Sequence, residues 1–159
     1  MRLTLFRVAP KRFIDNLSGL GGSYHDGGRW NEPGHPALYF GTSASVALLE
    51  MGHYIPAPRQ VPRDFVMGTY EVETDAIDTV DPNSLPEDWD RFPYPASTQA
   101  IGTDFLVAGK HLVLLAPSAA ACGIDQIAVV NPNHPDLQRL CLVQTRDQLY
   151  NPRLFQGLK

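Results

Sequence analysis

The apolar segments of this chain are short, and this feature limits most strongly the folds it can adopt. Three segments in the second half, HLVLLAPS, QIAVVNP and RLCLVQT, are apolar or β-branched runs of strand length, and each ends at a turn signal. In the first half, RLTLFRV and RDFVMGTYEVE alternate as strands do, and ALYF is a further short strand. Strands therefore outnumber helices. We expect an α+β fold with a mixed, mainly antiparallel sheet and a few helices packed on it.

Two helices and two long loops are expected between the strands. Thr42 or Ser43 is a good N-cap for a helix that reaches about His53, and Ser97 is expected to cap a second helix that ends near Gly109. The segments 18–36 and 75–96 are rich in glycine, or in proline and aspartate, and have no periodicity. Because 159 residues are the size of one domain, we expect a single domain over residues 1–159.

Composition excludes several classes of function. The net charge of −4 argues against nonspecific nucleic-acid binding, which normally requires a basic surface. No apolar run approaches the roughly 20 residues of a membrane helix. Two cysteines are too few for a disulfide framework and lack metal-ligand spacing. We expect a cytoplasmic protein that binds neither nucleic acid nor a membrane.

The stretch GGRWNEPGHPALYFGTSASVALLE, residues 27–50, holds the residues of greatest chemical interest. Arg29 follows two glycines and can present a planar fork to a phosphate or a carboxamide, or it is a surface arginine beside a turn. Tyr39 points to the opposite face from Leu38 and Phe40, so it faces a cleft if those two face the core. A half-buried strand tyrosine is the alternative.

Glu50 is expected at the edge of an otherwise apolar helix face, beside Val46. A partly desolvated carboxylate needs a partner and is a candidate functional group, although the side chain can also reach solvent. His53 follows three residues later, but two ligands of different type without a clear third do not predict a metal site. No metal is expected.

Taken in order, LFRV, the block from residue 27 to residue 50, LLAPSAA, VVNPNHP and NPRLF resemble the RES domain family over almost the whole chain. The resemblance implies the toxin half of a bacterial toxin–antitoxin pair, a fold related to the ADP-ribosyltransferases, and an activity that consumes NAD. By matching motif, the family's functional residues fall on Arg29, Tyr39, Glu50 and Ser118, and Arg7 matches an early arginine of the first strand.

The resemblance implies that NAD is the substrate and that no cofactor is needed. Cleavage of the nicotinamide–ribose bond builds positive charge on the ribose, which a fixed Glu50 carboxylate would stabilise. Tyr39 would stack on the nicotinamide, Arg7 and Arg29 would hold the pyrophosphate, and Ser118 would bind substrate or orient Glu50. The group that accepts the ADP-ribose stays open between water, phosphate and a protein side chain. For phosphate, His25 or His35 would supply a cation.

One alternative pair of catalytic carboxylates and two alternative functions remain at this stage. Glu71 and Glu73 share one face of a strand, and such a pair serves many protein-modifying ADP-ribosyltransferases. One alternative function is that of a protein-directed mono-ADP-ribosyltransferase toxin. The other possibility is a non-enzymatic module that binds a nucleotide or a partner peptide.

The resemblance also implies a partner, an Xre-type helix-turn-helix antitoxin, in a complex that can be a higher-order hetero-oligomer. We expect the segments 18–36 and 81–95 to form the walls of the NAD cleft. Tyr24, Trp89 and Tyr94 in these segments are residue types that anchor interfaces. The antitoxin would contact Arg29 or Arg7 through an acidic group or its C-terminal carboxylate.

Overall fold

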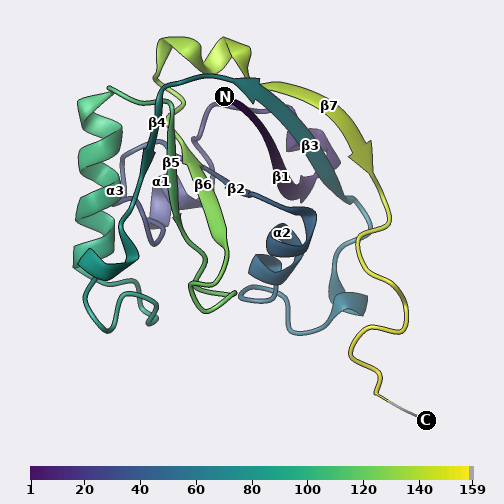
Figure 1. The fold of residues 1–159 in the computed structure, drawn as a ribbon. Helices are drawn as coiled ribbons and strands as arrows, with labels where there is room; N and C mark the ends of the chain where they lie inside the picture. The colour runs from purple at the N-terminus through teal and green to yellow at the C-terminus, as the bar shows by residue number, and fades with distance from the viewer. Residues whose placement is uncertain (158–159) are drawn as a thin grey trace.

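A computed structural model describes residues 1–157, and its centre is a seven-stranded sheet (Figure 1). The strands are β1 (Arg2–Pro10), β2 (Leu38–Gly41), β3 (Phe65–Glu73), β4 (Ile77–Thr79), β5 (Val113–Pro117), β6 (Gln126–Val130) and β7 (Cys141–Arg146). Their order in the sheet is β4-β5-β6-β2-β1-β3-β7. Only β4 and β5 pair in parallel, and all other neighbours are antiparallel. The expected mixed, mainly antiparallel sheet is confirmed.

Three α-helices accompany the sheet: α1 (Gly22–Asp26), α2 (Ala44–Met51) and α3 (Ala96–Ala108). Four short 3-10 helices lie in the connections: η1 (Lys11–Phe13), η2 (Pro58–Gln60), η3 (Pro82–Ser84) and η4 (Pro135–Arg139). Ser43 caps α2 as expected, since its side chain accepts a hydrogen bond from the Val46 backbone N–H. The Ser97 cap is wrong, because α3 begins at Ala96 and Pro95, two residues before Ser97, holds the N-cap position.

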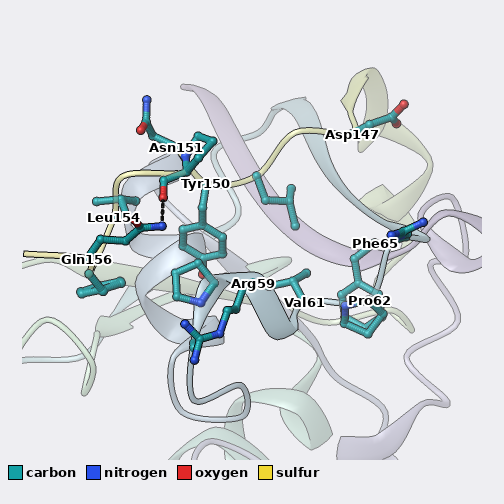
Figure 2. Close-up of a pocket in the computed structure, with 15 residues that line it drawn as sticks. Arg59, Val61, Pro62, Phe65, Asp147, Tyr150, Asn151, Leu154 and Gln156 are labelled. Carbon is teal, nitrogen blue, oxygen red and sulfur yellow. Dashed lines mark hydrogen bonds between the residues drawn. The ribbon is translucent and has the colours of Figure 1, made fainter.

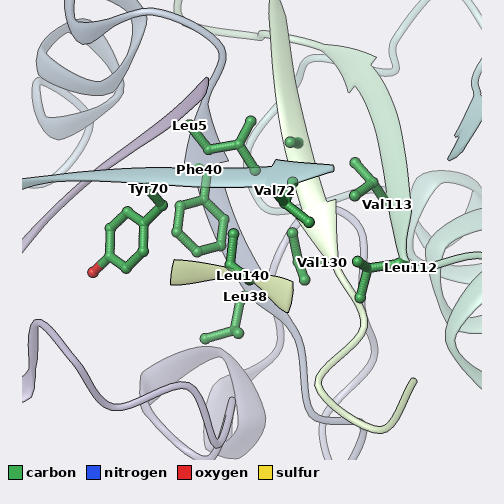
Figure 3. Packing of buried hydrophobic residues seen from close by; sticks show 10 residues of the cluster. Leu5, Leu38, Phe40, Tyr70, Val72, Leu112, Val113, Val130 and Leu140 are labelled. Carbon is green, nitrogen blue, oxygen red and sulfur yellow. The ribbon is translucent and has the colours of Figure 1, made fainter. Parts of the chain in front are cut away.

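The sheet has a hydrophobic cluster on each face, because successive residues of a strand point to opposite sides. One cluster, shown in Figure 3, contains Leu5, Leu38, Phe40, Tyr70, Val72, Leu112, Val113, Ala128, Val130 and Leu140. The other packs α2 and α3 against the sheet and contains Trp30, Ala37, Val46, Val80, Phe105, Leu106, Leu114, Ala116, Ile127 and Val129. Leu38 and Phe40 therefore face the first cluster, while Tyr39 packs against the second, as the alternation predicts.

An α-helix and a β-strand lie inside segments that the sequence predicts to be loops. The helix α1 falls within residues 18–36, and β4 falls within residues 75–96. The strand β4 has three residues and pairs with β5 from Ile77 to Thr79, so the partner strand, and not a local pattern, fixes its conformation. Within residues 1–157, no helix has the combined length and apolar character that crossing a membrane requires.

Candidate active site

A small pocket of about 150 Å³ opens beside α2, where β1 and β2 are joined by the single residue pair Phe6 and Gly41. By contrast, β1 and β3 pair along the whole of β1. The pocket is lined by Phe6, Arg7, Val8, Tyr39, Phe40, Gly41, Ala47, Glu50, Met51, Tyr54 and Ile127. Three of the predicted site residues, Arg7, Tyr39 and Glu50, therefore contribute to one pocket.

The last turn of α2 carries Glu50, whose two carboxylate oxygens have different neighbours. Ser118 directly follows β5 and is fully buried, and its Oγ donates a hydrogen bond of 2.6 Å to Glu50 Oε1. The same Oγ accepts the Ala121 backbone N–H at 3.2 Å, so the hydroxyl hydrogen is directed to the carboxylate. The other oxygen, Oε2, lies 3.5 Å from His53 Nδ1. The structure thus brings Ser118 and Glu50 together.

Tyr39 uses its hydroxyl to hold the glycine-rich loop. The phenol donates a 2.6 Å hydrogen bond to Asn31 Oδ1 and accepts the Trp30 backbone N–H at 3.1 Å. A Cβ on Gly28 would lie 2.6 Å from the Tyr39 hydroxyl, so only glycine allows this approach. Burial raises the pKa of Tyr39 far above the ordinary tyrosine value, and the phenol stays neutral. Its ring is left to line the pocket.

Arg29 is buried and holds the segment 85–95. Its Nη1 donates hydrogen bonds of 2.8 Å to the carbonyl oxygens of Trp89 and Arg91. The guanidinium lies 5.1 Å from the centre of the Tyr94 ring, a distance typical of a cation–π contact. Tyr94 in turn shares a 3.1 Å hydrogen bond with the hydroxyl of Tyr54, which lines the pocket. Arg29 is therefore linked to the pocket through two tyrosines.

Arg7 is fixed between two rings and a run of carbonyl groups. The guanidinium lies 5.6 Å from the Phe40 ring centre and 5.5 Å from that of Tyr70. Its Nη2 donates to the carbonyl oxygens of Phe13, Ile14 and Asn16, at distances of 3.0, 2.8 and 3.2 Å. The buried Nε has no hydrogen-bond partner among residues 1–157. Arg7 thus lines the pocket with a guanidinium that backbone carbonyl groups hold in place.

The alternative carboxylates lie outside this pocket. Glu71 forms an ion pair with Arg2 at 2.5 Å, and Glu73 is exposed. Neither residue lines the pocket that contains Glu50. Within the described part of the chain, no group of three or more His, Cys, Asp or Glu side chains could hold a metal ion.

Sequence reasoning missed three residues of the site. Asn31 and Tyr54 reach it through hydrogen bonds with tyrosines that are distant in the sequence. His53 is interpreted from the sequence only as a possible metal ligand. Its position three residues after Glu50 was the signal that the two side chains could be neighbours. Neither His25 nor His35 lines the pocket.

The expected interface aromatics are partly used inside the protein. Trp89 packs against the cluster beneath α2 and α3, and Tyr94 lies over Arg29. The exposed aromatic side chains beside the site are instead Phe92, 78% exposed, and Tyr54, 70% exposed. Phe92 packs edge-on against Tyr94, with the ring centres 5.2 Å apart.

A larger cavity of about 400 Å³ lies between residues 57–65 and the C-terminal segment 147–156 (Figure 2). Arg59, Tyr150 and Leu154 are among its lining residues, and it shares no residue with the pocket beside Glu50. Tyr150 donates a 2.5 Å hydrogen bond to the Leu48 carbonyl of α2. This cavity gathers no carboxylate with a hydroxyl or imidazole partner, so the smaller pocket is the candidate active site.

Comparisons with known proteins give a family model, sequence relatives and a structure of similar fold. A family model described as the RES domain matches residues 4–151. A protein named Toxin Res from Yersinia enterocolitica is 32% identical, over 96% of this chain and 99% of that protein. The Prs ADP-ribosylating toxin of Sphingobium sp. is 31% identical, over 89% of this chain and 88% of that protein. The crystal structure of the M. tuberculosis MbcT–MbcA toxin–antitoxin complex contains a chain of similar fold, with a TM-score of 0.72 and 24% identity over 92% of this chain and 84% of that chain.

Proposed function

The chain belongs to the RES domain family, and we propose from this premise that it is the toxin of a bacterial toxin–antitoxin pair that cleaves NAD at the nicotinamide–ribose bond. NAD is the substrate of this reaction, and no other organic group or metal takes part. Loss of NAD would arrest growth of the cell. The observation that carries the proposal is the hydrogen bond of 2.6 Å that fixes the Glu50 carboxylate to Ser118 at the edge of the pocket.

Glu50 supplies the charge that this reaction needs. When the glycosidic bond breaks, nicotinamide leaves with the bonding electron pair, and positive charge develops on the ribose. A carboxylate that is already oriented stabilises this charge without reorganising during the reaction. Because Ser118 occupies Oε1, Oε2 is the oxygen that accepts a hydrogen bond from a ribose hydroxyl.

The nicotinamide fits the pocket, and the rest of the dinucleotide lies outside it. A volume of about 150 Å³ is smaller than the roughly 300–1,000 Å³ typical of ligand sites. We therefore assign the pocket to the nicotinamide ring, against the Tyr39 ring. Arg7, which lines the pocket, and Arg29, which is linked to it through Tyr94 and Tyr54, are the cations that would hold the pyrophosphate. These local cations allow a chain of net charge −4 to bind an anion.

Incubation of the purified protein with NAD, followed by measurement of free nicotinamide, tests the proposal. The assay is run in phosphate-free buffer, with inorganic phosphate, and with a cell lysate as a source of protein acceptors. We expect release of nicotinamide in at least one of these conditions. If none releases it, the site is a nucleotide- or peptide-binding module and the proposal is wrong.

A protein acceptor is the second candidate, and one relative favours it. A protein 31% identical to this chain is named as an ADP-ribosylating toxin of Prs. The two reactions share the bond that breaks and differ only in the acceptor. Transfer of label from NAD to a lysate protein, in excess of free hydrolysis, would identify the chain as a protein-directed ADP-ribosyltransferase.

The partner that we propose is an Xre-type helix-turn-helix antitoxin that covers the pocket. Exposed Phe92 and Tyr54 stand beside the site and are residue types that anchor interfaces. An acidic group or a C-terminal carboxylate of the antitoxin would pair with Arg29 or Arg7. A saturating amount of the product of the neighbouring gene should stop NAD loss. Full activity in the saturated complex would refute occlusion of the pocket.

A further inference from the structure

The oxygen of Glu50 that faces the substrate has one further neighbour, His53. The Gly52 backbone caps α2, and the His53 backbone N–H donates to the Glu50 carbonyl at 3.1 Å, so the two side chains leave the same turn. Nδ1 of His53 lies 3.5 Å from Glu50 Oε2. The imidazole is 42% exposed, whereas the carboxylate is 27% exposed. His53 is therefore the more exposed of the two side chains, and its imidazole can be reached from solvent beside the carboxylate.

This arrangement prepares an imidazole to accept a proton. A carboxylate next to Nδ1 favours the tautomer that carries its hydrogen there, and this leaves the lone pair of Nε2 free. A separation of 3.5 Å is long for a hydrogen bond, but contacts of this kind often tighten only when substrate is bound. The carboxylate then also stabilises the imidazolium that forms.

We propose that His53 is the general base of the acceptor step, an inference that rests on the proposed cleavage of NAD. Nicotinamide leaves with the electron pair of its bond to C1″ of the ribose. A water oxygen then forms the new bond to C1″, and the proton that water loses passes to His53 Nε2 and from there to solvent. The products are ADP-ribose, nicotinamide and one proton. An acceptor that is already an anion does not need this base.

Water needs a general base and an anionic acceptor does not, and this difference gives a direct test. His53→Gln is assayed with NAD in phosphate-free buffer, and then with phosphate or azide as an anionic acceptor. The water product and the anion adduct are quantified by chromatography, and kcat and KM are determined for each. The control is His111→Gln, which removes an imidazole that lies 3.9 Å from Asp78 of β4, whereas His53 lies beside Glu50.

We expect His53→Gln to lower kcat for water by about 100-fold, the usual effect of losing a general base, with the KM for NAD within about twofold of the parent. Turnover with the anionic acceptors should fall much less, so the product ratio shifts toward the anion adduct. His111→Gln should behave as the parent. A loss of turnover with water alone would indicate a general base, because a structural defect would lower the turnover with both kinds of acceptor.

Several results would overturn the proposal. Equal losses with water and with anions would assign His53 to the orientation of Glu50. A larger loss with phosphate than with water would make it an anion-binding residue, and an unchanged rate would give it no role. If the parent protein does not cleave NAD with any acceptor, both the proposed function and this inference are wrong, an outcome that is distinct from failure of the His53 variant alone.

Discussion

At the scale of single residues, the site depends on how Glu50 is held. Ser118 occupies Oε1 at 2.6 Å, and this leaves Oε2 for the ribose and for His53. Hydrogen bonds to charged groups contribute about 1.5–3 kcal/mol. A free energy of this size in the transition state corresponds to roughly 10–100-fold in rate. In the proposed reaction, Ser118 is thus a positioning residue, and Glu50 is the group that would touch the substrate.

The Ser118→Ala variant should therefore lower kcat for NAD by roughly 10–100-fold, because the carboxylate loses its fixed orientation. The KM should change less than kcat. Steady-state kinetics of nicotinamide release check this, with Ser45→Ala as control, since Ser45 is an exposed serine on the same helix. Parent-like kcat in Ser118→Ala would show that Glu50 needs no support from this hydroxyl.

The Arg29→Lys variant should be inactive, although lysine keeps the positive charge. The arginine donates to two carbonyl groups and lies over the Tyr94 ring, and an ammonium group cannot reproduce both contacts. Growth arrest on expression and NAD turnover should both be lost. Arg91→Lys, a change at an exposed arginine in the segment that Arg29 contacts, is the control. A lysine variant as toxic as the parent would show that charge alone suffices.

The sequence predicted where the candidate residues lie within their helices and strands, but not which distant side chains they contact. Glu50 could be assigned to the edge of an apolar helix face because helical spacing is a local property. The hydrogen bond between Tyr54 and Tyr94 spans 40 residues, and that between Glu50 and Ser118 spans 68. The resemblance to the family supplied Ser118, but nothing in the sequence linked Tyr54 to Tyr94. Such contacts depend on the tertiary fold.

At the scale of elements, α3 fixes the loop that carries Arg29. A Cβ on Gly102 of α3 would lie 1.7 Å from the Trp30 carbonyl oxygen, so the helix backbone touches the loop directly. Trp30 itself is fully buried in the cluster beneath α3. Because Arg29 precedes Trp30 in the chain, the position of its guanidinium depends on this contact.

The Gly102→Ala change should lower the free energy of unfolding by about 1–3 kcal/mol, as overpacking against a rigid backbone does. NAD turnover should fall with it, since Arg29 must move. Gly22→Ala, at a glycine with open space around it, should change stability by no more than about 0.5 kcal/mol. Urea titrations of both variants measure this. If Gly102→Ala and Gly22→Ala have equal free energies of unfolding, α3 can move away from Trp30 without loss of stability.

The elements that sequence reasoning missed are those without a pattern of their own. The three residues of β4 are too few to display an alternation, and their conformation comes from pairing with β5. The N-terminus of α3 was misplaced because Ser97 is a better cap by residue type than Pro95. The seven-residue and longer alternations, such as those of β1 and β3, were assigned correctly.

At the scale of the whole molecule, buried tyrosines tie the loops to the sheet. Tyr39 holds the glycine-rich loop through Asn31, and Tyr70 donates to the Ile14 carbonyl from the opposite face. Burial raises the pKa of both phenols above the ordinary value. Both hydroxyl groups act as hydrogen-bond donors only while they are protonated.

Stability should consequently fall in alkaline solution. Above about pH 10 the tyrosines of the unfolded chain release protons that the folded chain retains, so the free energy of unfolding decreases as pH rises. Urea titrations at pH 8 and above pH 10 measure the decrease. Tyr70→Phe should reduce the dependence, and Ile14 would still have Arg7 as a donor. If the free energy of unfolding of Tyr70→Phe depends on pH as strongly as that of the parent, Tyr70 does not contribute to the loss of stability at high pH.

The central claim, that Glu50 stabilises the charge of NAD cleavage, is tested most directly by the turnover of Glu50→Gln. The two side chains are nearly isosteric, so the fold should be kept, while nicotinamide release should fall by roughly 100–1,000-fold or more with little change in NAD binding. Glu71→Gln, which removes the carboxylate paired with Arg2, should remain active. Near-normal turnover by Glu50→Gln together with an inactive Glu71→Gln would contradict the account and move the site to β3.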